Sequence, residues 1–525
     1  MTANNTPPPL LDYNLFTSDP ALVAAVEREG ARWALSHVAE FGRALGAERI
    51  IRLGFEANEN PPVLRPEDDV VFFNAAWHEL MTLSVENGLH SLPWRDNRPG
   101  ANVARAALMF LASQNEAGHT CPISMTFSSI PALRHNPELA QEWEPRILSN
   151  AYDPRFRPAS DKKGVLIGMS MTEKQGGSDV RANTTKAEPL ERSEYRITGE
   201  KWFCSAPMSD AFLILAQAPR GLTCFFLPRF RPDGKRNEFH IQRLKPKLGN
   251  RSNASAEIEL RGAWAVRVGE EGRGVPTIIE MVQRTRLDCA IGSAALMRQA
   301  VTQAAYHAQR RQAFGARLAD HALMRNVLAD LTLESQAATM LVMRLARSFD
   351  APSADTAGQA FARLATPVAK YWISKRAPAV VVEAMECLGG NGYIDGCIMP
   401  RLHREAPLNS IWEGCGNIIC LDVLRALKKD PEIGETILHE ARLARSGDRR
   451  FDVFMNALES DLPKVDEYGA RRLVERLALA LQASLMIRYA GAADADAFCA
   501  SRLSGGGHLF GALPGLGAAA CSPAM

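Results

Sequence analysis

One carboxylate in the sequence has neighbours that suit proton abstraction. Glu413 lies between Trp412 and a Gly-Cys-Gly turn in the segment LNSIWEGCGNIIC, and the apolar period that follows predicts a helix over about 412–428. A carboxylate walled by Ile411 and Trp412 would lose hydration, which raises its pKa toward the range that a general base needs. An acidic residue at a helix N-terminus is also stabilised by the helix dipole alone. Glu413 is therefore either a base or a complement to that dipole.

Two further segments, in a region of β-type alternation, could hold a polar ligand with a flat ring. MSMTEKQGGSDV, over residues 169–180, places Thr172 and Ser178 beside a glycine pair whose N–H groups are unshielded. KWFCSA follows, with two aromatic residues and a hydroxyl on a predicted strand. The alternatives are a strand with a glycine turn, and aromatic side chains that belong to the core.

Two more segments follow in the helical part of the chain. Arg311 and Phe314, in RRQAFG near the end of a long predicted helix, could present a guanidinium to a pyrophosphate. Gly389 and Gly390, in GGNGY after another helix, would allow a ligand to approach the backbone. The alternatives are an arginine that complements the helix dipole and a glycine helix cap.

In this order and at these separations, the five segments resemble the acyl-CoA dehydrogenase family across essentially residues 1–430. That family has the signatures Thr-Glu-x-x-x-Gly-Ser-Asp, Arg-x-x-Phe-Gly and Gly-Gly-x-Gly-Tyr. In the family, a Tyr-Glu-Gly-Thr element precedes the last core helix. The resemblance implies that Glu413 is the catalytic base and that FAD is the cofactor. Some members carry the base on an earlier helix directly before an arginine, but here Thr285 precedes Arg286.

The resemblance also assigns the other site residues. Gly389 and Gly390 would reach the FAD of a neighbouring subunit. Ser178 and Arg286 would lie near the acyl-CoA substrate. The residues expected to bind FAD are Met169, Met171, Thr172, Gly177, Ser178, Phe203, Ser205, Arg311, Phe314, Gly389, Gly390, Cys415 and Asn417.

Further features resemble one branch of the family, the AidB-like alkylation-response flavoproteins. The flavin loop MTEKQGGSDVRANTT lacks the usual Pro-x-Ala, Trp412 and Cys415 replace the usual Tyr and Thr, and an extension of about 95 residues follows the last core helix. This resemblance implies a homotetramer with weak activity on short branched acyl-CoA of the isovaleryl-CoA type. It also implies binding to double-stranded DNA and protection of DNA from alkylation. The alternative is a metabolic short- or branched-chain acyl-CoA dehydrogenase without a DNA role.

The positions of these segments require several domains. The chain has 525 residues, too many for one core. Helical period dominates the first 165 residues or so, including Pro20 to Leu45 and Val70 to Asn87. Short β-type runs follow, in the pattern of an antiparallel sheet or barrel, and helical period then returns over about 276–310, 320–349, 356–388 and 412–428.

These elements predict an α+β protein of the acyl-CoA dehydrogenase type. We expect an N-terminal helical domain (1–163), a middle antiparallel β domain (164–274), a C-terminal four-helix bundle (275–430) and an extra helical region (431–525) of two or three helices. The Gly/Ala/Pro-rich composition from Ser504 onward favours a disordered tail.

Composition restricts the possible partners. Lys and Arg total 61 against 59 Asp and Glu, a net charge of +2, so no global field favours a polyanion. The ten cysteines form no CxxC pair and suggest reduced thiols, and no metal site is predicted. No signal peptide or apolar run long enough to span a membrane is evident, so a cytoplasmic protein is expected.

A local basic face could still bind DNA. The extension from residue 430 has 10 Lys or Arg against 13 Asp or Glu, a net charge of −3, whereas a DNA-binding module is usually basic as a whole. Arg425, Lys428 and Lys429 are spaced three to four apart on one helix face, and Arg425 and Lys428 are the best candidates for phosphate contacts. The alternative is a solvated face whose basic residues pair with neighbouring acids.

Overall fold

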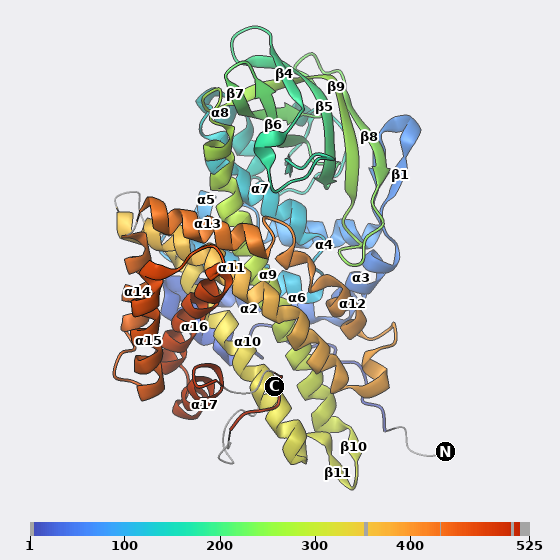
Figure 1. Cartoon of the computed structure of the whole chain (residues 1–525). Coiled ribbons are helices and arrows are strands. Elements are labelled where there is room, and N and C mark those ends of the chain that lie inside the picture. Colours follow the sequence, from blue (N-terminus) through green and yellow to red (C-terminus); the bar gives the residue numbers. More distant parts are fainter. Residues whose placement is uncertain (1–4, 351–354, 431, 506–508, 515–525) are drawn as a thin grey trace. The chain divides into compact units, whose positions relative to one another are not determined.

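A computed structural model describes all residues except 1–4, 351–354, 431, 506–508 and 515–525. Part of the tail predicted to be disordered from Ser504 therefore lies outside the described residues. The chain forms two compact units (Figure 1). One contains Met1–Glu48, Arg98–Gln114 and Arg286–Met525, and the other contains Arg49–Asn97 and Asn115–Thr285. We call them the helical unit and the β unit.

The β unit is built on a seven-stranded sheet that closes on itself. Pairings run from β4 to β5, β9, β7, β6 and back to β4, while β3 pairs with β6 and β8 pairs with β9. Closure leaves few exposed strand edges. The strands are β3 (Ile167–Ser170), β4 (Lys186–Pro189), β5 (Glu194–Ser205), β6 (Ala211–Ala218), β7 (Gly221–Pro228), β8 (Phe239–Leu244) and β9 (Ser255–Val268).

The β unit differs from the sequence prediction in two places. The β3 strand pairs with β6 in parallel, not antiparallel, which the intervening 40 residues allow because they contain β4 and β5. The segment predicted as helix from Val70 is instead a strand over Val70–Phe72 (β2), paired with Val63–Arg65 (β1). The helix begins only at Ala75, where the Asn74 side chain accepts a hydrogen bond from the Ala76 N–H and caps it. The α-helices of this unit are most of α3 (Glu48–Glu59), α4 (Ala75–Glu86), α5 (Leu92–Arg95), α7 (Thr120–Leu133), α8 (Pro137–Ile147) and the first part of α9 (Gly274–Arg310).

Long helices dominate the helical unit. Those that hold the candidate site are the larger part of α9 (Gly274–Arg310), α11 (Thr356–Glu386) and α13 (Gly416–Lys429). The predicted ends of α9 to α11 agree within a few residues, but α13 begins at Gly416 and not near 412, because Glu413 and Gly414 have φ values of 58° and 99° that a helix excludes. The other helices are α1 (Pro20–Val26), α2 (Leu35–Gly46), most of α6 (Ala101–Asn115), α10 (Ala322–Ser348) and α12 (Ile398–Glu405), the last of which has no counterpart among the predicted helices.

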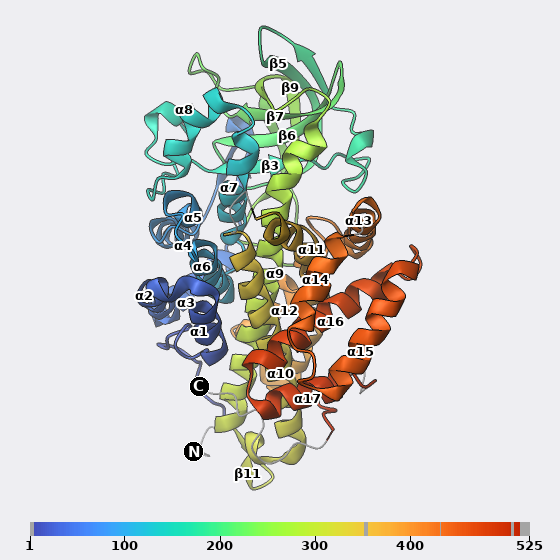
Figure 2. The same cartoon turned by 90° about the vertical axis from the view of Figure 1, so that its left-hand side faces the viewer.

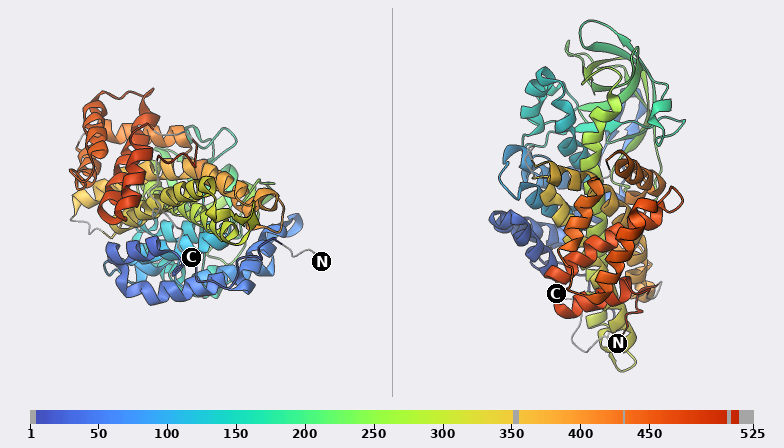
Figure 3. Two further views of the ribbon diagram at one scale, coloured as in Figure 1. Left: turned by 90° about the horizontal axis from the view of Figure 1, so that it is seen from below. Right: turned by 60° about the vertical axis from the view of Figure 1, so that its left-hand side comes forward.

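The described part of the extension forms four α-helices, one more than the upper expectation. They are α14 (Ile433–Arg442), α15 (Arg449–Asp461), α16 (Ala470–Tyr489) and α17 (Ala492–Arg502). Figures 2 and 3 show these orange and red helices against the yellow α10 and α11. Glu440 accepts from Arg344 of α10 (2.6 Å) and from Arg488 (2.9 Å), and Arg502 pairs with Asp330 of α10 (2.5 Å). The extension is thus joined to the bundle by ion pairs whose carboxylates are buried.

Two properties of the described residues bear on partners. None of the helices they form is both long and apolar enough to cross a membrane. Of the ten cysteines, nine lie in the described part, and these nine are free thiols.

A buried carboxylate, Glu116, joins three segments of the β unit through hydrogen bonds. Glu116 accepts hydrogen bonds from the Asn58 amide (2.9 Å), the Ser252 hydroxyl (2.8 Å) and the His119 imidazole (3.0 Å). His119 in turn lies 2.9 Å from the Ser84 hydroxyl. This Ser-His-Glu chain has the spacing of a nucleophile relay, but its members are at most 2% exposed, so a substrate does not reach Ser84. Burial by itself raises the pKa of Glu116, and the hydrogen bonds and charge of His119 reverse this and lower it to about 2.

Replacing this carboxylate should remove a pH-dependent part of the stability. Because the pKa of Glu116 is about 2 in the folded chain against an ordinary value of 4.5, the ionised form stabilises folding above pH 4.5, and that contribution disappears as the pH falls toward 2. Its size is on the order of 3 kcal/mol. We expect Glu116→Gln to lower the unfolding temperature at pH 7 and to differ less from wild type at pH 3, as followed by circular dichroism. The exposed Glu59→Gln is the matched control. An equal difference at both pH values would contradict the assignment.

Candidate active site

Two cationic side chains hold the turn that contains Glu413 by binding three consecutive backbone carbonyls. The Lys370 ammonium donates to the carbonyl of Trp412 (2.9 Å) and to that of Gly414 (2.6 Å), while Arg286 Nε donates to the carbonyl of Glu413 itself (3.1 Å). Glu413 has a φ of 58°, which costs a non-glycine residue energy and persists only where its surroundings enforce it. The two cations supply that enforcement.

The two cations come from helices that also contact each other through α13. Lys370 of α11 is 1% exposed, and burial lowers its pKa below the usual value for lysine. Arg286 of α9 pairs with Asp422 of α13 at 2.6 Å, and Asp422 also binds Arg363 of α11 at 3.0 Å. Burial alone raises the pKa of Asp422, but the two arginines lower it below its usual value. The Glu413 turn is therefore fixed to α9, α11 and α13 at once.

The apolar wall expected around Glu413 is only partly present. Ile411 is 62% exposed, so it does not form the buried wall that the sequence predicts. Trp412 is half-buried, and its indole N–H donates to the Asn409 side chain (2.8 Å). After the turn, Cys415 is exposed at the N-cap of α13, and the Asn417 side chain accepts from Arg471 of α16 (2.9 Å).

In the β unit, the predicted flavin loop follows β3 and is closed by glycine. A Cβ on Gly177 would lie 2.4 Å from the Thr172 hydroxyl, so a larger residue does not fit there. The Thr172 carbonyl accepts the backbone N–H of Trp202 (2.8 Å), which joins the loop to β5. Met169 is buried, Met171 is half-buried, and Ser178 is exposed on the loop.

A buried ion pair, which the sequence did not reveal, anchors this loop. Glu173 accepts from the Lys201 ammonium of β5 (2.8 Å), from the Thr184 N–H (2.6 Å) and from the Thr185 N–H (3.3 Å). Both charged side chains are at most 1% exposed. Burial raises the pKa of Glu173, but the Lys201 charge and these hydrogen bonds lower it below its usual value. The sequence signal was a lysine directly before Trp202 and Phe203 in a predicted strand.

A bulge in β5 explains the exposed aromatic side chain of the second segment. The register of β5 against β9 shifts between Lys201 and Cys204, and Phe203 inside the bulge is 49% exposed. Ser170 donates to the Phe203 carbonyl (3.2 Å). Ser205, half-buried, is paired with Ser255 of β9. The ring of Phe203 thus stands out from the sheet, on the strand that Trp202 joins to the flavin loop.

The Arg-x-x-Phe-Gly segment is a two-residue hairpin beyond the end of α9. Phe314 and Gly315 have φ values of 52° and 81° and join β10 (Gln312–Ala313) to β11 (Ala316–Arg317). Phe314 is 96% exposed, and Arg311 donates to the Asn5 carbonyl (3.1 Å). A helix rises about 1.5 Å per residue, so Arg310 lies roughly 36 Å along α9 from Arg286. Within one chain, the hairpin of β10 and β11 lies far from α13, as Figures 1 and 2 show.

The remaining predicted residues lie at the end of α11 and on α13. Gly389 has a φ of 60°, and a Cβ built on Gly389 or Gly390 meets nothing within 4 Å. Arg425 and Lys428 are exposed on α13, with no ion pair to any residue that the structure describes.

Comparison with known proteins identifies the chain. Family profiles match three successive segments: the N-terminal domain of adaptive response protein AidB over 5–154, the middle domain of acyl-CoA dehydrogenases over 168–263, and their C-terminal domain over 272–428. AidB of Escherichia coli strain K12, a putative acyl-CoA dehydrogenase, is 48% identical over 507 residues, which cover 95% of this chain and 93% of AidB. The chain belongs to the acyl-CoA dehydrogenase family, in its AidB-like branch.

Two further comparisons support this family membership. Acyl-CoA dehydrogenase family member 11 of Caenorhabditis elegans is 30% identical over 486 residues, which cover 87% of this chain and 78% of the worm protein. The crystal structure of Caenorhabditis elegans ACDH-11 in complex with C11-CoA has a TM-score of 0.87 at 27% identity and covers 96% of this chain and 93% of that chain. Members of the acyl-CoA dehydrogenase family are FAD-dependent oxidoreductases, so the predicted family, α+β fold and cofactor are confirmed.

The anchor of the flavin loop can be tested by stability. Glu173→Gln would leave the Lys201 ammonium buried without its counter-ion, and breaking a buried pair in this way costs roughly 3–5 kcal/mol. We expect a marked loss of unfolding temperature in differential scanning fluorimetry. The neighbouring pair of Lys174 and Glu200 is much more exposed, so Glu200→Gln should cost only about 0–1 kcal/mol. Equal losses of unfolding temperature in the two variants would contradict the prediction that burial makes the Glu173 pair more costly to break.

Proposed function

We propose that the chain is an acyl-CoA dehydrogenase in which Glu413 removes the α-proton of the thioester substrate. The observation that carries this proposal is the turn of residues 412–414, whose three carbonyls are held by Lys370 and Arg286. A base must be placed to within a fraction of an ångström, and a rigid turn meets that need. A mere complement to the helix dipole would not require two buried cations to fix a strained backbone.

FAD, when bound, supplies the acceptor for the hydride that leaves the β-carbon. The chain's own residues fit such a group. The ring of Phe203 is available for stacking, Thr172 and Ser178 offer hydroxyls on the flavin loop, and the unobstructed Gly389 and Gly390 allow a polar ligand to approach the backbone. Arg311 carries the guanidinium suited to a pyrophosphate, and Met169, Met171, Gly177, Ser205, Phe314, Cys415 and Asn417 complete the proposed set.

The proposed substrate is a short branched acyl-CoA of the isovaleryl-CoA type, with Ser178 and Arg286 near its thioester end. Isovaleryl-CoA dehydrogenase of rice is 28% identical over about half of this chain, which supports that choice, whereas the worm structure was solved with C11-CoA. The rate of flavin reduction should therefore be compared between short branched and longer straight-chain acyl-CoA.

Assembly into a homotetramer is the second part of the proposal. The hairpin with Arg311 and Phe314 lies far along α9 from Arg286, so one chain cannot use both in one compact site. A second copy can bring its own hairpin to the first. Exposed apolar side chains at Phe314, Leu323 and Tyr393 (96%, 84% and 80%) support such a contact, because large apolar surfaces on a folded chain usually mark interfaces.

A third part of the proposal is binding of double-stranded DNA through the face of α13 that carries Arg425, Lys428 and Lys429. These three are exposed, and they form no ion pair within the described residues. Several arginines of the extension are engaged with carboxylates: Arg442 and Arg445 with Glu459, and Arg450 with Asp448 and Asp496. Arg449, Arg471 and Arg472 are exposed and form no ion pair within the described residues, but they do not share one helix face with the α13 cations. Contacts of the α13 face with DNA would be sequence-independent. Protection of DNA from alkylation is proposed as the consequence, and a metabolic dehydrogenase without a DNA role is the alternative.

Loss of the base should separate chemistry from folding. We expect Glu413→Gln to retain its flavin and to be reduced by isovaleryl-CoA about 10²–10⁴-fold more slowly than wild type, because a positioned general base contributes that much. The measurement is anaerobic bleaching of the flavin absorbance in stopped flow, repeated with longer straight-chain acyl-CoA. The exposed Glu432→Gln is the control. Unchanged bleaching in Glu413→Gln would refute its role, and a preference for long chains would refute the isovaleryl type.

The DNA surface can be tested through salt. Changing Arg425, Lys428 and Lys429 to alanine should weaken duplex binding equally for different sequences, and should flatten the plot of log K against log salt by about 0.9 per lost phosphate contact. Fluorescence anisotropy over about 50–200 mM salt gives both quantities. Arg450→Ala, whose guanidinium is occupied by carboxylates, is the control and should change the slope little. No binding by the wild-type chain at low salt would favour the metabolic alternative.

A further inference from the structure

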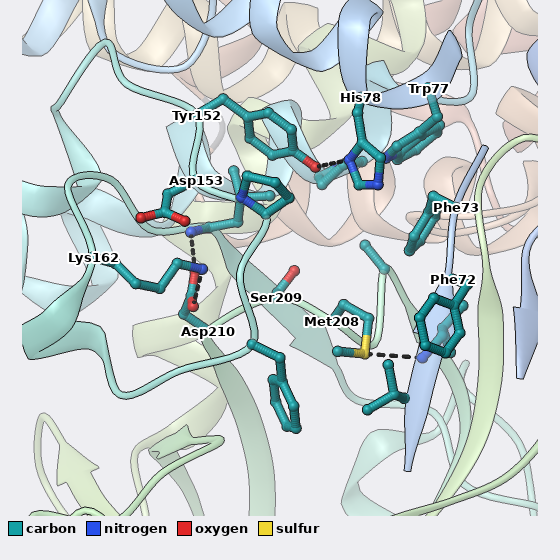
Figure 4. A pocket seen from close by; sticks show the side chains of 17 residues that line it. Phe72, Phe73, Trp77, His78, Tyr152, Asp153, Lys162, Met208, Ser209 and Asp210 are labelled. Carbon is teal, nitrogen blue, oxygen red and sulfur yellow. Dashed lines mark hydrogen bonds and ion pairs between the residues drawn. The ribbon is translucent and has the colours of Figure 1, made fainter. Parts of the chain in front are cut away.

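The β unit contains a cavity that none of the expected flavin or substrate residues lines. Its volume is about 240 Å³ (Figure 4). Its 17 lining residues come from β2, α4, the start of α7, the loops around Tyr152 and Lys162, and the loop that precedes β6. Pockets for drug-sized ligands usually measure roughly 300–1,000 Å³. This cavity therefore suits a smaller molecule of one or two rings.

Aromatic rings form much of the wall. Phe73 and Trp77 are stacked, with centroids 4.8 Å apart and planes 22° apart, and the His78 ring is stacked on Tyr152. Phe72 and Phe156 also line the space. Flat ligands gain from such walls because aromatic faces favour offset stacking or edge contacts with other rings.

One hydroxyl in the wall has no protein partner. Ser209 is 1% exposed, and its Oγ makes no hydrogen bond with any residue that the structure describes. Figure 4 shows this hydroxyl pointing into the cavity. A buried polar group without a hydrogen bond is costly, so Ser209 favours a ligand with a donor or acceptor at its edge.

The imidazole of His78 provides a second polar group. Its Nδ1 is 2.9 Å from the Tyr152 hydroxyl, and its other ring nitrogen is turned toward the cavity in Figure 4. Burial lowers the pKa of His78, so the ring is neutral near pH 7. It can therefore exchange a hydrogen bond with a ligand without adding charge.

The charged groups of the wall are already paired. Lys162 binds Asp210 at 2.6 Å, and Asp210 also accepts the Leu166 N–H at 2.8 Å. Asp153 is held by Arg155, whose hydrogen bonds lower the pKa of Asp153 to about 2. Among the described residues of the wall, no cation is left for a phosphate or a carboxylate, so an acyl-CoA thioester or another anion is disfavoured.

From these contacts, we propose that this cavity binds an uncharged nitrogen heteroaromatic molecule of one or two rings. Its faces lie against Phe73 and Tyr152, and its edge bonds to Ser209 and His78. The proposal does not depend on the acyl-CoA chemistry, because the cavity shares no residue with that site.

The test uses the full-length flavoprotein and four probes: indole and benzimidazole as uncharged heteroaromatics, indole-3-carboxylate as an anion, and cyclohexanol as a non-planar alcohol. Isothermal titration near pH 7 measures Kd for each. We expect the two heteroaromatics to bind and the anion and the alcohol to bind at least about tenfold more weakly.

Ser209→Ala decides whether binding occurs in this cavity. It should raise the Kd of indole roughly three- to tenfold, because one hydrogen bond is lost. Its unfolding temperature without ligand should stay equal or rise, because an unsatisfied buried hydroxyl is removed. The exposed Ser160→Ala is the matched control and should change neither quantity. The proposal is overturned if no heteroaromatic binds, if indole-3-carboxylate binds as tightly as indole, or if Ser209→Ala leaves the Kd unchanged.

Discussion

The geometry at Glu413 depends on two cations that hold main-chain oxygens. Lys370 and Arg286 hold three successive carbonyls, and this allows a non-glycine residue to keep a positive φ directly before a glycine with another positive φ. Helix α13 can start only after this turn, at Gly416, and Asp422 on α13 then neutralises Arg286. The position of the carboxylate, the start of the helix and the charge balance around them are thus parts of one arrangement.

In the β unit, buried charged side chains also fix the backbone of loops, but there the charged groups are carboxylates that accept from N–H groups. Glu173 is paired with Lys201, and Glu116 with His119, and in both cases a carboxylate without solvent contact gathers backbone N–H groups from a loop. A buried pair contributes little net stability compared with apolar packing, but breaking one partner is costly. Such pairs therefore fix the position of a loop more than they strengthen the fold. The two loops that they fix are the flavin loop and the loop between α6 and α7.

Local sequence patterns predicted much of this. Two of the β-type runs predicted between residues 164 and 274 are AFLILAQA and FHIQRL, and they form β6 and β8 with the same ends. The long helices agree within a few residues. The signature segments led to the family, the fold and FAD. What local patterns could not reveal were pairings across long separations: Lys370 with the turn more than 40 residues later, Glu173 with Lys201, and the parallel pairing of β3 with β6. They also could not show that Ile411 points to solvent, because an apolar residue beside a tryptophan has the same pattern whether buried or exposed.

The net charge of the extension does not reveal which of its charged side chains are paired, and the structure supplies that information. Two acidic residues of the extension are paired with arginines of α10 and of the extension: Glu440 with Arg344 and Arg488, and Glu459 with Arg442 and Arg445. Arg425, Lys428 and Lys429 on α13 form no ion pair within the described residues, and Arg425 lies about 14 Å along the helix from Gly416 at its start. The extension adds Arg449 and Arg472, which are likewise exposed and without an ion pair in the described chain. One helix therefore carries the Glu413 turn at its beginning and the basic face at its end.

The two ends of α13 are also chemically independent within the described chain. Asp422 forms its ion pairs with Arg286 and Arg363, and the clamped turn is held by Lys370 and Arg286, so neither draws on the basic face. A loss of phosphate contacts at Arg425, Lys428 and Lys429 need not disturb the carboxylate at the other end. The proposed dehydrogenase chemistry and the proposed DNA contacts can therefore be tested separately by substitution.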